Sequence, residues 1–403
     1  MALREITYNK QIFPISYTKI PAHLATQHLS TDSTNSINKN IIFLHGWGSN
    51  KELMQQAFEN VFLEYNHFYI DLPGFGKSPN EILLNTHDYA KIVSAFLDSF
   101  KITANVIVGH SYGGKVAILL QNMQQETQDI ILLSSAGILT PKPLKIRAKI
   151  ALAKLAKILH FNLPFLRAND AKGLSPVMYE IFKNIVNEDF SEIFSACKKR
   201  TIIFWGNEDK ATPIESGYKI HSLITNSKFF ACKGGHYFFL TQGKIIQTMY
   251  NVMTKNNSAR KAMQESKNYI IYHIIVQGNV QGVGYRKFAK AVAKTRDIIG
   301  STQNLANGEV EIYAYGNEES MLDFISELWS GPARANVENL IINPIDEVNW
   351  SKQEQIILAF LDSTKSLIES SETKNATQTS HIAESNNLVK STKLQDFVIL
   401  RLD

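Results

Sequence analysis

The chain has little of what marks exported, membrane-spanning or nucleic-acid-binding proteins. Its 403 residues include only two cysteines, Cys197 and Cys232, which we expect to be reduced core residues rather than a disulfide. No stretch approaches the ~20 apolar residues of a membrane span, and the polar residues 1–5 lack the apolar core of a signal peptide. The net charge of +5 is spread along the chain, without the aromatic-interleaved basic stripe that nucleic acid needs. We therefore expect a cytoplasmic protein with no nucleic-acid partner and no stable membrane association, and small anionic substrates account best for its positive charge.

Short apolar runs alternate with helix-length segments through the first part of the chain. They predict strands at residues 41–44, 68–70, 106–108, 130–133, 201–205 and 228–231. This alternation indicates an α/β fold, with a mostly parallel sheet covered by helices on both faces. Residues 139–199 interrupt this alternation of strand and helix patterns and include a basic amphipathic pattern at 144–161. We interpret the interruption as an inserted helical lid; a helix lying on a membrane surface is the alternative.

A chain of this length is expected to form two domains, and the polar residues 254–268 offer the best boundary. We predict domains at 1–255 and 269–403 with a linker at 256–268. The second domain has strand patterns at 270–276, 298–304, 310–315, 337–342 and 397–402, and helix patterns at 285–295 and 318–329. The βαββαβ order is that of an α+β, ferredoxin-like fold. A polar insertion at about 350–392, with a Ser-, Thr-, Asn- and Glu-rich part at 363–392, is predicted to be disordered.

Ser111 lies in Gly109-His110-Ser111-Tyr112-Gly113, between an apolar run and a helix-like segment. A sharp strand-to-helix turn needs small flanking residues because the serine backbone is strained there. The pattern predicts a nucleophile elbow, which raises the serine hydroxyl at the carboxyl end of the sheet.

A serine hydroxyl needs a base, and the base needs an acid that orients it. His236 follows the strand at 228–231, and Asp209 follows the strand at 201–205 with Glu208 beside it as the alternative acid. The order Ser, Asp, His is the one this architecture uses. The backbone N–H groups of Trp47 and Tyr112 would form the oxyanion hole.

Together these features resemble the α/β-hydrolase fold family over about residues 14–253. The turn at residues 71–78, Asp-Leu-Pro-Gly-Phe-Gly-Lys-Ser, strengthens the resemblance. It is not a phosphate-binding loop, because Asp71 stands where that motif needs its first glycine. The resemblance implies a doubly wound sheet with a helical lid, and hydrolysis of an ester or a related carboxylic bond, with cleavage of a C–C bond left open.

A second candidate site joins a predicted strand to a predicted helix at residues 278–286. The backbone N–H groups of such a glycine-rich loop form an anion nest, and the helix N-terminus adds positive potential. We expect phosphate to be held by Gln281, Gly282, Val283, Gly284, Tyr285 and Arg286. The planar guanidinium of Arg286 suits bidentate contact with phosphate. Asn304 ends a neighbouring strand, where a neutral amide can hold a water molecule without repelling phosphate.

Residues 269–344 and 396–402 closely resemble acylphosphatase in this loop, in the interval from Arg286 to Asn304 and in the following Asn-Gly turn. The resemblance implies hydrolysis of a carboxyl-phosphate anhydride, with Arg286 binding phosphate and Asn304 orienting water, and neither metal nor other cofactor is expected. Two departures stand out. Gly300-Ser301-Thr302 replaces the Gly-Trp-Val that is usual in the family, and the polar insertion precedes the last strand.

The sequence thus predicts a bifunctional hydrolase that acts on two small-molecule substrates, an ester-like compound and an acyl phosphate. In the alternatives, only one half is catalytic, or the C-terminal half is a phosphate-ligand sensor or interaction module. The sequence indicates neither the acyl groups nor the oligomeric state.

Overall fold

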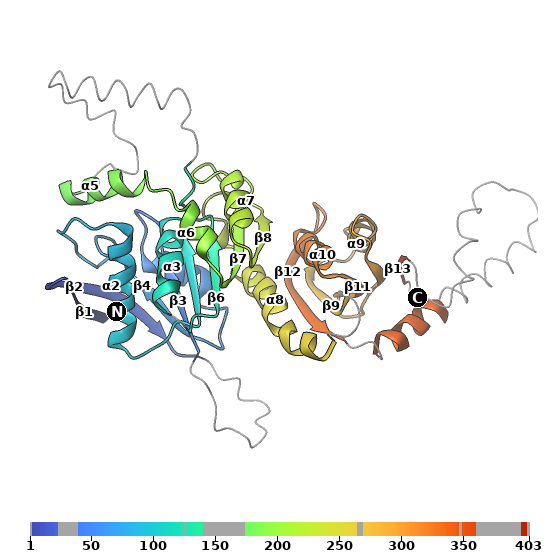
Figure 1. Cartoon of the computed structure of the whole chain (residues 1–403). Coiled ribbons are helices and arrows are strands. Elements are labelled where there is room, and N and C mark those ends of the chain that lie inside the picture. Colours follow the sequence, from blue (N-terminus) through green and yellow to red (C-terminus); the bar gives the residue numbers. More distant parts are fainter. Residues whose placement is uncertain are drawn as a thin grey trace, which may run out of the picture. The chain divides into compact units, whose positions relative to one another are not determined.

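The computed structural model describes residues 2–22, 39–124, 126–139, 174–263, 269–345, 349–359 and 396–400. The chain divides into two compact units, Met1–Gly243 and Lys244–Asp403 (Figure 1). Helix α8 (Gly243–Met263) continues into the segment predicted as a linker, and the predicted domain limits stay predictions. The predicted helix at 144–161 and the segment 363–392 lie outside the described residues. None of the helices within the described ranges is long and apolar enough to cross a membrane.

Unit 1 is built on an eight-stranded sheet with the order β1-β2-β4-β3-β5-β6-β7-β8. Strands β3 to β8 are parallel to one another, whereas β2 runs antiparallel to β1 and β4. The six predicted strands are confirmed, but the hairpin of β1 and β2 was not predicted. The strands are β1 (Ala2–Tyr8), β2 (Gln11–Ile20), β3 (Asn40–Leu44), β4 (Asn66–Ile70), β5 (Val106–His110), β6 (Asp129–Leu133), β7 (Arg200–Gly206) and β8 (Ser227–Cys232).

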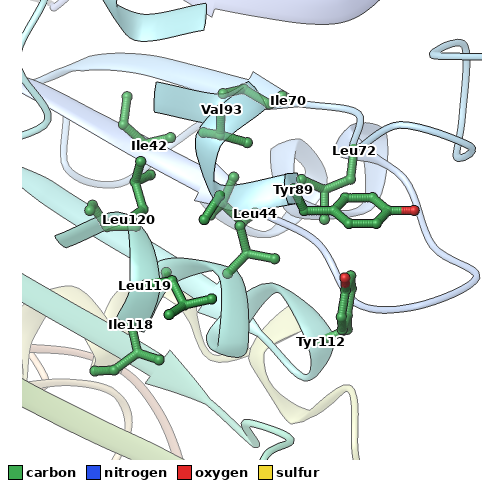
Figure 2. Close-up of a cluster of buried hydrophobic side chains, with 14 of the residues drawn as sticks. Ile42, Leu44, Ile70, Leu72, Tyr89, Val93, Tyr112, Ile118, Leu119 and Leu120 are labelled. Carbon is green, nitrogen blue, oxygen red and sulfur yellow. The ribbon is translucent and has the colours of Figure 1, made fainter. Parts of the chain in front are cut away.

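Helices cover both faces of this sheet because its strands are apolar on both sides. On one face, Ile42 and Leu44 of β3 join a buried cluster with Tyr89 and Val93 of a covering helix (Figure 2). On the other face, the Phe43 ring stacks on Phe58 with 5.1 Å between centroids. The helices are α1 (Lys51–Phe58), α2 (Thr86–Ser99), α3 (Tyr112–Met123), α5 (Pro176–Ile185), α6 (Ser191–Ala196) and α7 (Ile214–Leu223), with a short 3-10 helix, η3 (Phe238–Leu240).

The strand order reverses direction next to β3, and this reversal indicates where a ligand would bind. From β3 the chain moves to β4 on one side and then crosses to β5 on the other side. Ligands of open parallel sheets bind at such a reversal, outside the carboxyl ends of the strands. The candidate oxyanion loop follows β3 and Ser111 follows β5, so both lie at this point.

Unit 2 has a five-stranded sheet with the order β12-β9-β11-β10-β13. The pairs are antiparallel except for β10 with β13, which are parallel. The elements from β9 to β12 confirm the predicted βαββαβ order, and β13 adds a fifth strand beside β10. The elements are β9 (Tyr269–Asn279), α9 (Tyr285–Lys294), β10 (Ile299–Asn304), β11 (Val310–Asn317), α10 (Glu318–Ser330), β12 (Asn336–Pro344) and β13 (Phe397–Ile399).

The start of the predicted polar insertion differs from the expectation of disorder. Residues 349–359 form a helix, which we call helix 349–359. Trp350 and Ile357 on it are 6% and 0% exposed. The prediction was wrong for these residues because two apolar side chains, spaced two turns apart, are enough to seat a short helix on the sheet.

Candidate active sites

Ser111 occupies a strained turn between β5 and α3. Its backbone has φ 50° and ψ −113°, a sparsely populated region that costs on the order of 1–3 kcal/mol and is found mainly at functional sites. The flanking glycines are required by close approach: a Cβ on Gly109 would lie 2.5 Å from the Gly113 carbonyl oxygen, and one on Gly113 would lie 2.3 Å from the Leu44 oxygen. The geometry is the elbow that the sequence predicts.

The loops after β7 and β8 bring Asp209 and His236 together. His236 Nδ1 lies 2.7 Å from Asp209 Oδ2, and the Asp209 side chain is fully buried. Glu208, the alternative acid, is exposed. The shorter residue is therefore the one placed to orient the imidazole, with the Nε2 side of the ring left for proton transfer.

Asp209 is held in its ionised form by several donors. Burial would raise the pKa of this carboxyl group, but the hydrogen bonds from His236 and from the Thr212 amide outweigh it and lower the pKa to about 2. Oδ1 accepts the amides of Ala211 and Thr212 at 2.8 and 2.9 Å, and Thr212 Oγ1 lies 2.9 Å from Oδ2. The sequence reasoning missed Thr212, although an aspartate that caps its own turn is a recognisable local pattern.

His110 links the serine strand to the histidine loop. Its Nε2 donates to the His236 carbonyl oxygen at 3.0 Å, and the two rings lie 4.6 Å apart. Burial lowers the pKa of His110 to about 3, so it is a neutral hydrogen-bond donor near pH 7. Within the described residues Ser111 Oγ makes no direct hydrogen bond to His236, and such contacts often tighten only when substrate binds.

Trp47 and Tyr112, the two residues of the predicted oxyanion hole, lie close to Ser111. A Cβ on Gly46, next to Trp47, would lie 3.1 Å from the Ser111 Cβ, so this loop passes directly beside the serine. The Trp47 and Tyr112 rings meet edge to face at 5.6 Å. His45 fixes the start of the loop, because its Nε2 accepts the Leu72 amide at 3.0 Å.

In unit 2, residues Gly278 to Gly284 join the end of β9 to the start of α9. Gly278, Gly282 and Gly284 have φ values of 121°, 71° and 83°, which L side chains rarely adopt. No other atom lies within 4 Å of a Cβ built on Gly282 or Gly284, so these two glycines serve backbone conformation rather than packing. Such successive N–H groups suit an anion.

The Gln281 side chain ties this loop to the turn after Asn304. Its Nε2 donates to the carbonyl oxygens of Leu305 and Glu309 at 2.8 and 2.7 Å. Asn304 pairs with the buried Val310 of β11, so its side chain lies on the sheet face that α9 covers. The glycine-rich loop is thereby tied to the turn that directly follows Asn304.

Arg286 lies in the first turn of α9 and is partly buried. Its Nη1 donates to the Leu400 carbonyl oxygen at 3.3 Å. No local signal in the sequence points to Leu400 as a partner, because more than a hundred residues separate the two positions.

Residues 300–302, Gly-Ser-Thr in place of the Gly-Trp-Val usual in acylphosphatases, are closely packed. Ser301 and Thr302 are 2% and 0% exposed. Gly300 has φ 152°, and a Cβ there would lie 1.9 Å from the Tyr313 oxygen. Thr302 Oγ1 is buried without a hydrogen-bond partner among the described residues. Within the same residues, no group of three or more His, Cys, Asp or Glu side chains is arranged to hold a metal ion.

Comparison with known proteins identifies two classes of hydrolytic enzyme domain. A family model described as alpha/beta hydrolase fold matches residues 39–172, and the acylphosphatase model matches residues 272–354. The acylphosphatase of Archaeoglobus fulgidus is 40% identical over 85 residues, which are 21% of this chain and 96% of that protein. The acylphosphatase of Chlorobaculum tepidum is 41% identical over 86 residues, 21% of this chain and 92% of that protein. Among solved structures, an esterase from Exiguobacterium antarcticum matches with a TM-score of 0.48 and 19% identity, covering 62% of this chain and 98% of the esterase.

The chain therefore combines an alpha/beta hydrolase domain with an acylphosphatase domain. Through its C-terminal unit it belongs to the acylphosphatase family.

Proposed function

We propose that this protein is a bifunctional hydrolase, with a serine-dependent esterase-like site in unit 1 and an acylphosphatase site in unit 2. The observation that carries the first assignment is the 2.7 Å contact between His236 and a buried, ionised Asp209, beside an elbow that presents Ser111. The second assignment is supported by the similarity of the C-terminal unit to acylphosphatases, and by the positions of Arg286 in the first turn of α9 and of Asn304 at the end of β10.

In the first reaction, Ser111 Oγ attacks the carbonyl carbon of the substrate while its proton passes to His236 Nε2. Asp209 keeps the imidazole in the tautomer that can accept this proton and stabilises the positive charge that follows. The amides of Trp47 and Tyr112 stabilise the oxyanion. The leaving group takes the proton from His236, and water then releases the acyl group from Ser111.

In the second reaction, the loop amides of residues 281–285 and the Arg286 guanidinium hold the phosphoryl oxygens. The Asn304 amide orients a water molecule for attack on phosphorus, and the bond to the acyl oxygen breaks to give carboxylate and phosphate. A carboxylate in place of Asn304 would repel the phosphate, whereas a neutral amide does not. A cytoplasmic location is part of the proposal, and both cysteines are buried free thiols, as expected in a reducing compartment.

The test measures two variants on two substrates, a p-nitrophenyl ester and benzoyl phosphate. Ser111→Ala is expected to lower ester hydrolysis by several orders of magnitude and to leave benzoyl phosphate hydrolysis unchanged. Asn304→Ala is expected to do the reverse and to keep near-normal inhibition by inorganic phosphate, because Arg286 remains. Matched controls are Ser222→Ala and Asn307→Ala, which change exposed residues of the same types.

A Ser111→Ala protein with wild-type esterase activity would refute the serine mechanism. An Asn304→Ala protein with wild-type activity on benzoyl phosphate would refute the catalytic role of Asn304, and the phosphate-sensor alternative would take its place.

A further inference from the structure

Helix 349–359 covers part of the sheet face opposite to α9 and α10. Its Trp350 and Ile357 form a buried cluster with Ile271 and Leu400. The Trp350 ring also stacks on Tyr315, with 5.5 Å between centroids and 20° between planes. Ile271 and Tyr315 are paired across β9 and β11, and their neighbours in each strand face the helix-covered core. Helix 349–359 therefore packs on the outer face of the sheet.

Leu400 connects this outer face to the candidate phosphate site. Its side chain is 5% exposed and belongs to the cluster with Trp350. Its amide donates to the Thr302 carbonyl oxygen at 2.8 Å. Its carbonyl oxygen accepts the hydrogen bond from Arg286 Nη1 at 3.3 Å. One residue thus contacts the helix, β10 and the arginine.

The attachment of Leu400 depends on side-chain packing because β13 is short. The strand has three residues and pairs with Gly300, Ser301 and Thr302 of β10. A long stretch of chain separates β12 from β13, and the entropy cost of closing such a loop grows with its length. Phe397 anchors the start of β13 by an edge contact with Phe324, 5.8 Å between centroids. Leu400, which directly follows β13 and carries the contact to Arg286, is anchored by the cluster with Trp350.

We propose that helix 349–359 positions Arg286 for phosphate binding, by holding Leu400 where its carbonyl oxygen orients the guanidinium. The inference rests on the proposed acylphosphatase function for its biological meaning, but it concerns phosphate binding itself. Trp350 is a positioning residue, since it lies across the sheet from the site and acts through Leu400. Loosening this contact lets the guanidinium sample orientations that do not face the cradle, and phosphate affinity falls as a result.

The test measures binding of inorganic phosphate to the full chain by calorimetry, with kcat and KM for benzoyl phosphate alongside. Trp350→Ala is expected to weaken phosphate binding on the order of tenfold, the loss expected when one hydrogen bond to a charged group is no longer well placed. Trp350→Phe should restore most of the affinity because it keeps an aromatic ring in the cluster that contains Leu400. Ile356→Ala is the matched control, since Ile356 lies on the same helix and is 59% exposed.

A double-mutant cycle separates positioning from general loosening. If Trp350 acts through the arginine, Trp350→Ala has little further effect on phosphate binding in an Arg286→Ala background. Thermal unfolding checks that unit 2 remains folded, and Ile357→Ala supplies the same measurement should Trp350→Ala not fold. Wild-type phosphate affinity in a folded Trp350→Ala or Ile357→Ala variant, or additive losses in the cycle, would overturn the inference. A wild-type protein that binds phosphate through Arg286 but does not hydrolyse benzoyl phosphate would refute the proposed function and leave the positioning role standing.

Discussion

Replacing Lys51 by methionine is expected to destabilise unit 1 strongly, and more at neutral than at acid pH. Lys51, the first residue of α1, and Asp71 are a buried ion pair, with exposed side-chain fractions of 1% and 0% and 2.8 Å between Nζ and Oδ2. Asp71 also accepts the amides of Lys51 and Lys77 at 2.8 and 3.1 Å. Removing one partner of a buried pair typically costs about 3–5 kcal/mol, because the other charge stays buried without compensation.

The pH dependence follows from the pKa of Asp71 in the two proteins. In the wild type, burial would raise the pKa of Asp71, but the hydrogen bonds from Lys51 and Lys77 outweigh it and lower the pKa below its usual value. Its contribution to stability is therefore fully present above the unfolded pKa of about 3.9, and is constant between pH 5 and 7. Without Lys51, burial is expected to raise the pKa of Asp71 above the unfolded value. The variant then loses stability as pH rises through that raised pKa.

The difference in unfolding free energy between wild type and variant should thus be smaller at pH 5 than at pH 7. One unit of pKa is worth about 1.4 kcal/mol, so we expect a change of at least about 1 kcal/mol. Urea unfolding is followed by tryptophan fluorescence in a Trp329→Phe, Trp350→Phe background. Of the four tryptophans, that leaves Trp47 and Trp205, both in unit 1.

The matched control is Lys183→Met. Lys183 pairs with Glu180, but both side chains are substantially exposed, 41% and 54%. Such a pair contributes at most about 1 kcal/mol. A Lys51→Met variant no less stable than this control, or one with the same loss at pH 5 and pH 7, would refute the reasoning.

Three further outcomes are expected. Asp209→Asn should lower kcat for a p-nitrophenyl ester by about a thousandfold or more, whereas Glu208→Gln should leave it near wild type; the opposite ranking would move the acid to Glu208. His110→Gln keeps a donor for the His236 carbonyl and should hold ester hydrolysis within about tenfold, whereas His110→Leu should lose more; equal rates for the two would dismiss the hydrogen bond. Thr302→Val removes a buried hydroxyl without a partner and should leave the unfolding free energy of unit 2 unchanged or raise it by about 1 kcal/mol; a loss of 1 kcal/mol in urea unfolding would contradict this.

The parts of the fold that the sequence predicts correctly depend on neighbouring residues. Apolar runs locate the central strands, and glycines mark the turn around Ser111 and the loop before Arg286, because these requirements are local. The hairpin of β1 and β2 was not predicted, because its turn lacks such a local signal. Its turn is made by Asn9 and Lys10 with φ values of 48° and 61°, and it contains none of the glycines that usually signal such a turn.

Contacts between distant residues could not be predicted. Lys51 and Lys115 are 1% and 2% exposed, although lysine is nearly always a surface residue. Each is buried because an acidic side chain from a distant part of the chain pairs with it. For Lys115 this partner is Glu188, whose Oε2 lies 2.5 Å from Lys115 Nζ. The hydrogen bond of Arg286 to Leu400 has the same origin, since it exists only once β13 has paired with β10.

The place of β13 in the chain sets an order for folding during synthesis. The last strand of the first sheet, β8, ends at Cys232, so the ribosome exposes that complete sheet long before the second one can close. Because domains generally fold as units while the N-terminal parts emerge first, a nascent chain would complete the sheet of β1 to β8 before the hydrogen bond of Arg286 to Leu400 can form. An interrupted translation product that ends before residue 396 would therefore contain the complete first sheet but lack β13 and the contact of Leu400 with Arg286.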